Sequence, residues 1–408
     1  MRERPWAITR EISEMSAPII NDTTLCDGEQ TVGVAFTLDQ RCAIAAALSR
    51  AGVAEIEVGI PALGEDEIAC IKAIVDLNLD ARLMVWGNLT QRDLAAALRC
   101  NADIVHLSIP VSDIRLQDKL QKPRRWVLEQ IVRVIAEAVK SDRKISLGME
   151  DASRADPAFL VQVARCAQQH GAQRVRFADT LGVLDPFSTY EAIARLRDAV
   201  DLEIEIHAHD DLGLATANTL AALRAGATHA NTTVDCLGKR AGNAALEEIV
   251  IGARHLLGRD TGINTEALPA VCRLIEWASG RIIFSDKSIV DRGVLTSDPS
   301  DRTGGITKHR RTHEEFEYPQ PGRQRSVALG EHCGPQSVHQ AYSALGVSVA
   351  EWLVPLLLDR IRHFAAQYKQ APSASDLYRF LAEAGETLDL RLAEALRALK
   401  LDLSRTDS

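Results

Sequence analysis

Short β-rich runs alternate with longer, alanine-rich amphipathic runs up to about residue 275, and this pattern constrains the fold more than any other feature. Such alternation is typical of βα units around a parallel sheet. Eight units favour a closed (β/α)₈ TIM barrel, although strand count alone leaves an open doubly wound sheet possible. The candidate strands are "IINDTTL" (19–25), "EIEVG" (55–59), "ARLMVWG" (81–87), "IVHLSIP" (104–110), "KISLGMED" (144–151), "RVRFADT" (174–180), "EIEIHAHD" (203–210) and "HANTTVDCLG" (229–238).

Polar residues gather at the ends of these runs. Barrel enzymes carry their chemistry at the C-terminal ends of the strands, so this placement predicts an active site there. The residues are Asp27, Glu57, His106, Ser108, Glu150, Asp151, Asp179, Thr180, His207 and His209.

The "IHAHDD" segment is the most specific local signal. Residues two apart project from the same face of a strand, so His207 and His209 can reach one ion. Asp27, at another strand end, completes a set of two imidazoles and one carboxylate that leaves positions open for substrate and water. Two structural histidines are the alternative, but the added carboxylate favours a metal site.

A metal there gives the neighbouring polar residues expected roles. Glu150 and Asp179 are expected to hold metal-bound water or to orient the histidines, and Thr180 to bind a substrate carboxylate. Asn243 is expected either to cap the helix after the eighth strand or to face the site.

The composition changes near residue 285, where Asp, Arg, Pro, Gly and His become frequent, and helical periodicity returns further on. This change predicts four parts. They are an N-terminal extension (1–18), the barrel (19–284), an irregular linker or lid (285–330) and a small α-helical C-terminal domain (331–408).

Charge and composition exclude several classes of function. A net charge of -9 without a basic stripe argues against nucleic acid as a partner, and no apolar run approaches the roughly 18 residues of a membrane span. The N-terminus has no signal-like apolar region. The eight cysteines include no C-x-x-C pair, which fits a reducing cytoplasm.

Several motifs in combination resemble the isopropylmalate synthase family of Claisen-condensing barrel enzymes (the DRE-TIM metallolyases), and most closely the homocitrate synthases of nitrogen fixation. These motifs are "DTTLCDGEQTVGVAF", "AGVAEIEVGIPALGEDE", "VHLSIPVSD", "MEDASRADP", "RFADTLGVLDPF", "HAHDDLGLATANTLAA" and "LGKRAGNAALEE". The resemblance implies a homodimer that condenses acetyl-CoA with 2-oxoglutarate to homocitrate, the organic ligand of the nitrogenase iron–molybdenum cofactor.

The resemblance also implies roles for individual residues. It places a divalent metal, Mg²⁺ or Mn²⁺ first and Zn²⁺ or Fe²⁺ as alternatives, on Asp27, His207 and His209. It associates further positions with metal or oxo-acid binding, namely Gln30, Glu57, His106, Ser108, Glu150 and Thr180.

The chain departs from this family at a catalytic position. The family has an arginine before the metal-binding aspartate, and this chain has Cys26. A thiol is a weak neutral donor, and no cation adjacent in sequence favours a thiolate. Losing one preorganised donor costs about 10²–10³ in rate, so we expect Cys26→Arg to raise the rate.

Other departures lie around the same barrel mouth. The family's H-E-S-G-[IL]-H element reads "SDPSDR" (297–302), with His309, His313 or His332 as possible substitutes. The family's N-G-L-G-E-R reads "DCLGKR", which brings in Asp235, Cys236 and Lys239, and its W-C-R reads "WGN", with Asn88 last.

Three functions remain open from the sequence. The first is homocitrate synthase, the second is aldol-type cleavage of a 2-oxo or 3-hydroxy acid on the same metal, and the third is a binding protein that has lost turnover. The intact metal ligands favour the first two, and the lost arginine and lid histidine favour the third.

Overall fold

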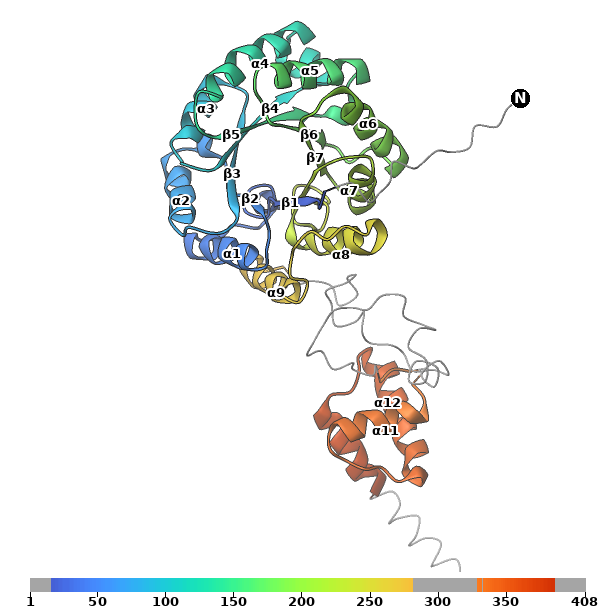
Figure 1. Ribbon diagram of the computed structural model, residues 1–408. Coiled ribbons are helices and arrows are strands. Elements are labelled where there is room, and N and C mark those ends of the chain that lie inside the picture. The colour runs from blue at the N-terminus through green and yellow to red at the C-terminus, as the bar shows by residue number, and fades with distance from the viewer. Residues whose placement is uncertain (1–15, 282–328, 332, 386–408) are drawn as a thin grey trace, which may run out of the picture. The chain divides into compact units, whose positions relative to one another are not determined.

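Eight parallel strands close into a barrel in the order β1 to β8 in the computed structural model, which describes residues 16–281, 329–331 and 333–385 (Figure 1). Closure is direct, because β1 and β8 pair along their whole length. The predicted barrel is therefore confirmed over an open sheet. The strands are β1 (Ile19–Asp22), β2 (Glu55–Glu57), β3 (Arg82–Asn88), β4 (Ile104–Pro110), β5 (Lys144–Glu150), β6 (Arg174–Asp179), β7 (Glu203–Ala208) and β8 (His229–Thr232).

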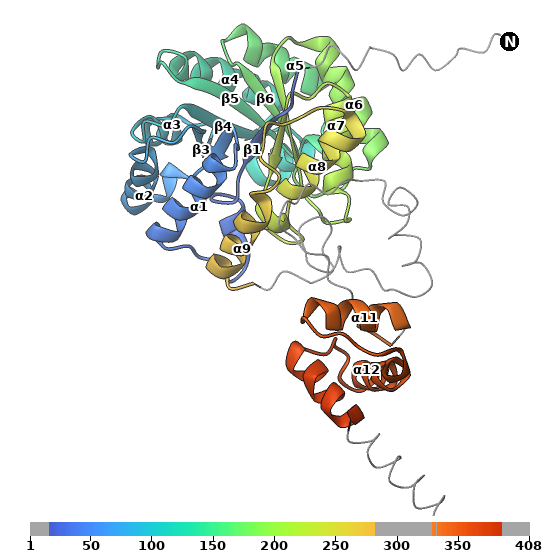
Figure 2. The same cartoon turned by 60° about the horizontal axis from the view of Figure 1, so that its bottom comes forward.

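Helices surround the barrel (Figure 1 and Figure 2). Their apolar faces pack against the strands. Their starts follow from local chemistry. Thr37 forms a capping box with Gln40, and Asp156 and Asp185 each accept two backbone N–H groups just before a proline. The helices are α1 (Leu38–Arg50), α2 (Glu65–Val75), α3 (Gln91–Leu98), α4 (Arg124–Ala138), α5 (Pro157–Gln169), α6 (Pro186–Ala199), α7 (Ala215–Arg224), α8 (Leu246–Leu257) and α9 (Leu268–Ser279).

The first and last strands are shorter than the sequence predicts. After Asp22 the chain turns, because the Asp22 carboxylate accepts the Thr24 N–H at 3.0 Å. After Thr232 it enters a loop in which Asp235 and Cys236 adopt positive φ values of 56° and 60°. The expected strand over 229–238 is therefore wrong beyond Thr232, and the site residues of these two units stand on loops.

The C-terminal unit is α-helical, as predicted. It contains α11 (Pro335–Ala344), α12 (Val354–Tyr368) and a further helical segment over 374–385. Its own core includes Tyr342, whose hydroxyl donates to the Leu377 carbonyl at 2.7 Å. Contacts divide the chain into this unit and the barrel unit.

Part of the predicted linker lies outside the described residues, which do not include 282–328 and 332. The stretch 297–302 and the histidines His309, His313 and His332 are among those residues. Of the helices that the structure describes, none combines the length and apolar character needed to cross a membrane.

Candidate metal and substrate site

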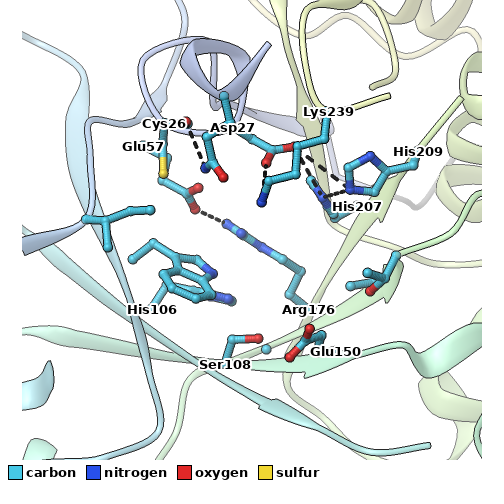
Figure 3. A pocket seen from close by; sticks show the side chains of 16 residues that line it. Cys26, Asp27, Glu57, His106, Ser108, Glu150, Arg176, His207, His209 and Lys239 are labelled. Atoms are coloured by element: carbon cyan, nitrogen blue, oxygen red, sulfur yellow. Dashed lines mark hydrogen bonds and ion pairs between the residues drawn. The ribbon is translucent and has the colours of Figure 1, made fainter. Parts of the chain in front are cut away.

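Asp27, His207 and His209 converge at the C-terminal mouth of the barrel (Figure 3). The two Nε2 atoms of the histidines are 3.2 Å apart, and each lies 3.9 Å from Oδ2 of Asp27. Ligands that bind one ion at about 2.1 Å and at right angles lie about 3 Å apart, so the spacing of the imidazoles fits a shared ion. These three residues form a possible metal site.

Both imidazoles are prepared to offer a lone pair. Nδ1 of His207 lies 2.6 Å from Oδ1 of Asn231, an acceptor, so Nδ1 carries the proton and Nε2 is left for an ion. Burial, followed by the nearby His207 ring, lowers the pKa of His209 to about 3. Asn231 cannot be singled out from the sequence, because its partnership with His207 depends on the register of two neighbouring strands.

Asp27 is held by the loop after β8. The Asn243 amide donates to Oδ2 of Asp27 at 2.9 Å and to the Leu237 carbonyl at 2.9 Å. Burial opposes the ionised carboxylate, but the two imidazoles and the Asn243 amide outweigh it and lower the pKa of Asp27. Asn243 therefore supports the side chain of Asp27. It does not cap α8, whose N-cap is Ala245.

A cavity of about 240 Å³ opens beside these ligands. Most of the residues that the sequence proposes for the site line it; the exceptions are Asp151, Asp179 and Asn243, of which Asn243 is buried behind Asp27. The lining also includes residues that the sequence analysis did not assign to the site. The cavity is lined by Cys26, Asp27, Gln30, Glu57, Ile60, Trp86, His106, Ser108, Gly148, Glu150, Arg176, Ala178, Thr180, His207, His209 and Lys239.

Cys26 is a neutral side chain at the cavity wall. Burial, reinforced by the Glu57 and Asp27 carboxylates, raises its pKa well above the usual value for a thiol. Gln30 is fixed beside it, since its amide donates to the Cys26 carbonyl at 3.1 Å. The structure therefore opposes a thiolate at position 26.

Arg176 on β6 is a buried cation in the cavity wall that the sequence analysis missed. Its Nη2 lies 2.6 Å from Glu57 and 3.0 Å from Glu205. Its Nε is buried without a hydrogen-bond partner among the described residues, as is Nε2 of His106. The signal was present in the sequence, because "RVR" and the two "EIE" segments place charges two apart, on one face of each strand.

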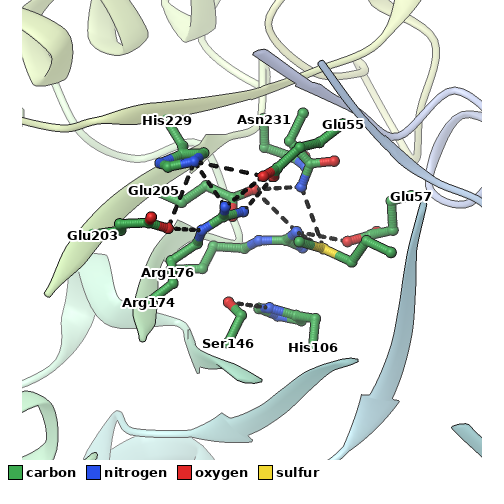
Figure 4. Close-up of polar contacts among 12 residues, drawn as sticks. Glu55, Glu57, His106, Ser146, Arg174, Arg176, Glu203, Glu205, His229 and Asn231 are labelled. Carbon is green, nitrogen blue, oxygen red and sulfur yellow. Dashed lines mark hydrogen bonds and ion pairs between the residues drawn. The ribbon is translucent and has the colours of Figure 1, made fainter. Parts of the chain in front are cut away.

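Beneath the cavity, the barrel interior contains charged side chains where most barrels contain aliphatic ones (Figure 4). Arg174 is fully buried, and its guanidinium contacts Glu55 at 2.6 Å, Glu205 at 3.1 Å and Nε2 of His229 at 2.7 Å. Glu205 also contacts Arg176, and this shared carboxylate joins the network to the cavity wall. A buried ion pair gains little net stability, but removing one partner is costly.

The strand ends of β5 and β6 supply further polar groups. Glu150 forms an ion pair with Arg115, which the sequence did not bring to the site. Thr180 accepts the Asp151 N–H at 2.8 Å, which leaves its own O–H to donate. The expected role of the Asp179 carboxylate is wrong, because its oxygens accept the N–H groups of residues 183 and 184 at 3.1 and 3.0 Å and hold a turn.

Comparisons with known proteins agree with this geometry. The sequence matches the family model described as HMGL-like over residues 17–275. It is 41% identical over 351 residues to 2-isopropylmalate synthase 2 of Caldanaerobacter subterraneus, covering 86% of this chain and 91% of that protein. It is 40% identical over 369 residues to homocitrate synthase 1 of Nostoc sp., covering 90% and 98%.

A solved structure shares the fold at lower identity. The HMG-CoA lyase of Bacillus subtilis superposes with a TM-score of 0.60 and 22% identity, covering 66% of this chain and 96% of that chain. This likeness bears on the barrel alone.

Proposed function

This chain belongs to the HMGL-like family, and from that premise we propose that it is an acyltransferase that condenses acetyl-CoA with 2-oxoglutarate and hydrolyses the resulting thioester with one water to give homocitrate and CoA. Relatives named as isopropylmalate, homocitrate and citramalate synthases all lie near 40% identity, so their names support a reaction between an acyl-CoA and a 2-oxo acid without selecting the acid. The observation that carries the proposal is the possible metal site at one side of a cavity lined by His106, Ser108 and Thr180.

The polarity of the cavity supports a dicarboxylic 2-oxo acid. His106 and Arg176 line it and have buried nitrogens without partners among the described residues. A second carboxylate offers acceptors to such donors, whereas the isopropyl group of 2-oxoisovalerate leaves them unpaired. Ser108 adds a hydroxyl to the same wall. The proposed substrate is therefore 2-oxoglutarate, and the use that we propose for the homocitrate is nitrogenase cofactor assembly.

The residues divide the chemistry between them. Asp27, His207 and His209 would hold a divalent ion, with Mg²⁺ or Mn²⁺ first, and that ion would supply a Lewis acid for the keto oxygen. The Thr180 hydroxyl donates a hydrogen bond to the carboxylate next to the ketone. Glu150 is the proposed proton acceptor for the acetyl methyl group.

Cys26 limits the rate in this account, because a neutral thiol stabilises a developing oxyanion poorly. The second candidate function is an oxo-acid-binding homologue without turnover. The neutral Cys26 is the observation that favours it. The homodimer that the resemblance implies stays a prediction.

Thiol release from acetyl-CoA tests the proposal when it is measured with 2-oxoglutarate, 2-oxoisovalerate and pyruvate in turn. We expect 2-oxoglutarate to give the highest kcat/KM, with homocitrate identified as the product by mass spectrometry. A preference for either other acid would move the protein to another reaction of the family. Binding of 2-oxoglutarate without thiol release would support the binding homologue.

A further inference from the structure

Two cations line the described cavity, and they differ in how strongly they are engaged. Arg176 is buried and contacts two carboxylates, Glu57 and Glu205, at 2.6 and 3.0 Å. Its charge is therefore already matched. Half of the Lys239 side chain is open to solvent, and its Nζ lies 3.8 Å from Oδ1 of Asp27.

The Lys239–Asp27 contact (Figure 3) is too long for a hydrogen bond, and its Lys239 side is open to water. Exposed pairs of this kind contribute little stability, so replacing the Asp27 oxygen with another anionic oxygen costs little. The ammonium is thus placed to accept an anionic partner that enters the cavity.

The residues on both sides of Lys239 are held by hydrogen bonds, so the loop keeps Lys239 at the cavity. The Gly238 N–H donates to the Thr31 hydroxyl at 2.8 Å. Arg240 is anchored through Nη2 to the Thr180 carbonyl at 2.7 Å and through Nε to Asp211 at 2.7 Å. Arg240 holds a left-handed conformation with φ of 58°, a conformation that costs energy for a residue other than glycine.

The same anchor relates Lys239 to the substrate groups. Arg240 binds the carbonyl of Thr180, whose hydroxyl lines the cavity, so the Lys239 loop and the end of β6 are held together. Across the cavity, position 26 is a cysteine, which supplies no positive charge. Of the two cations that line the cavity, Lys239 is therefore the one that is not already paired with two acids and can meet a carboxylate bound near Asp27 and Thr180.

We propose that Lys239 binds the carboxylate next to the ketone of the 2-oxo acid substrate, so that the loop after β8 contributes the cation that position 26 lacks. This inference rests on the proposed function for the class of substrate. Lys239 acts on substrate binding, whereas position 26 acts on the charge that develops during reaction. Removal of the Lys239 charge is therefore expected to weaken the affinity for the 2-oxo acid.

Binding of 2-oxoglutarate to the full-length protein with Mn²⁺, measured by calorimetry without acetyl-CoA, tests this role. We expect Lys239→Met to raise the Kd for 2-oxoglutarate about 10- to 100-fold, because one charge-assisted contact is lost. Lys239→Arg retains the charge and is expected to recover most of the affinity. Binding of Mn²⁺ alone is expected to change less than about threefold in both variants, since Asp27 keeps its Asn243 contact.

Lys140→Met is the matched control, because it removes an exposed lysine that pairs with Glu137 on the barrel's outer surface. Its Kd for 2-oxoglutarate should equal that of the unaltered protein. An unchanged Kd in Lys239→Met, or an equal loss in Lys239→Met and Lys239→Arg, would overturn the role of Lys239 and leave the proposed function standing. Failure of the unaltered protein to bind 2-oxoglutarate would instead reject the proposed substrate, and the inference with it.

Discussion

Cys26 lies between two acids, Glu57 and Asp27, at a position where its charge matters to the proposed reaction. The sequence already argues against a thiolate, because Asp27 follows Cys26 and no cation is adjacent. The folded barrel adds burial and the Glu57 carboxylate from another strand end, and both keep the thiol neutral.

Replacing Cys26 with arginine places a permanent cation at this wall. We expect kcat for thiol release to rise about tenfold or more, because a charged donor stabilises the developing oxyanion. Steady-state kinetics measure this, with Cys26→Met as a control of bulk without charge. Equal rates in the arginine and methionine variants would show that charge at position 26 does not limit the reaction.

Asn231 provides a second prediction at this scale, because it sets the tautomer of His207. Asn231→Leu removes the acceptor for Nδ1 and is expected to weaken Mn²⁺ binding about 10- to 100-fold, as loss of such supporting contacts typically does. Asn231→Asp keeps an acceptor and should bind Mn²⁺ nearly as well as the unaltered protein. Calorimetric titration with Mn²⁺ decides, and equal affinities in all three proteins would refute the role of Asn231.

Strands and loops explain which site residues the sequence could predict. Residues at strand ends were found because the barrel brings all C-terminal ends to one mouth. Arg176 and Asn231 were missed because they lie within strands, where a polar side chain gains meaning only from the register of its neighbours. The Asp179 carboxylate was misassigned because turn formation competes for the same oxygens.

The loop after β8 depends on glycine at a point of close approach. Gly242 has φ of 100°, and a Cβ there would lie 1.8 Å from the Cys236 carbonyl oxygen. Gly242→Ala must therefore move the loop that carries Lys239 and Asn243. We expect it to weaken Mn²⁺ and 2-oxoglutarate binding together and to lower the free energy of unfolding by about 1–3 kcal/mol.

Gly258→Ala is the control for backbone strain alone. Gly258 also has positive φ, at 63°, but a Cβ there meets no atom within 4 Å. Urea unfolding and ligand titration on both variants separate strain from collision. If Gly258→Ala impairs binding as much as Gly242→Ala, the geometry of the β8 loop is not what places the ligands.

At the scale of the whole molecule, the sequence predicted the closed barrel and the α-helical C-terminal unit, since both rest on repeated periodicity over many residues. The interior ion network was not predicted, because it needs the simultaneous register of β2, β6, β7 and β8. A barrel with charges at its centre depends on pH for its stability.

Asp22, at the end of β1, gives a stability prediction of defined sign. Burial, partly offset by hydrogen bonds from Thr24, raises the pKa of Asp22 to about 7. The folded state therefore keeps a proton on Asp22 that the unfolded state releases above about pH 4. The contribution of Asp22 to the free energy of unfolding consequently falls as the pH rises from about 4 to 7. Relative to that of Asp22→Asn, the free energy of unfolding of the unaltered protein should fall by about 2–3 kcal/mol between pH 5 and pH 8.

Urea unfolding of both proteins at the two pH values measures this difference directly. The comparison with the variant cancels the buried glutamates, whose lowered pKa values act in the opposite direction. If the difference in free energy of unfolding between the two proteins does not change with pH, Asp22 is ionised in the folded barrel.

The central claim is that Asp27, His207 and His209 hold the ion on which condensation depends, and metal removal tests it most directly. Thiol release with acetyl-CoA and 2-oxoglutarate is measured before chelation, after chelation and after Mn²⁺ is restored, with Asp27→Ala alongside. We predict turnover that is lost on chelation, returns with Mn²⁺ and is absent from Asp27→Ala at every step. Turnover that survives chelation, or that persists in Asp27→Ala, would contradict the account.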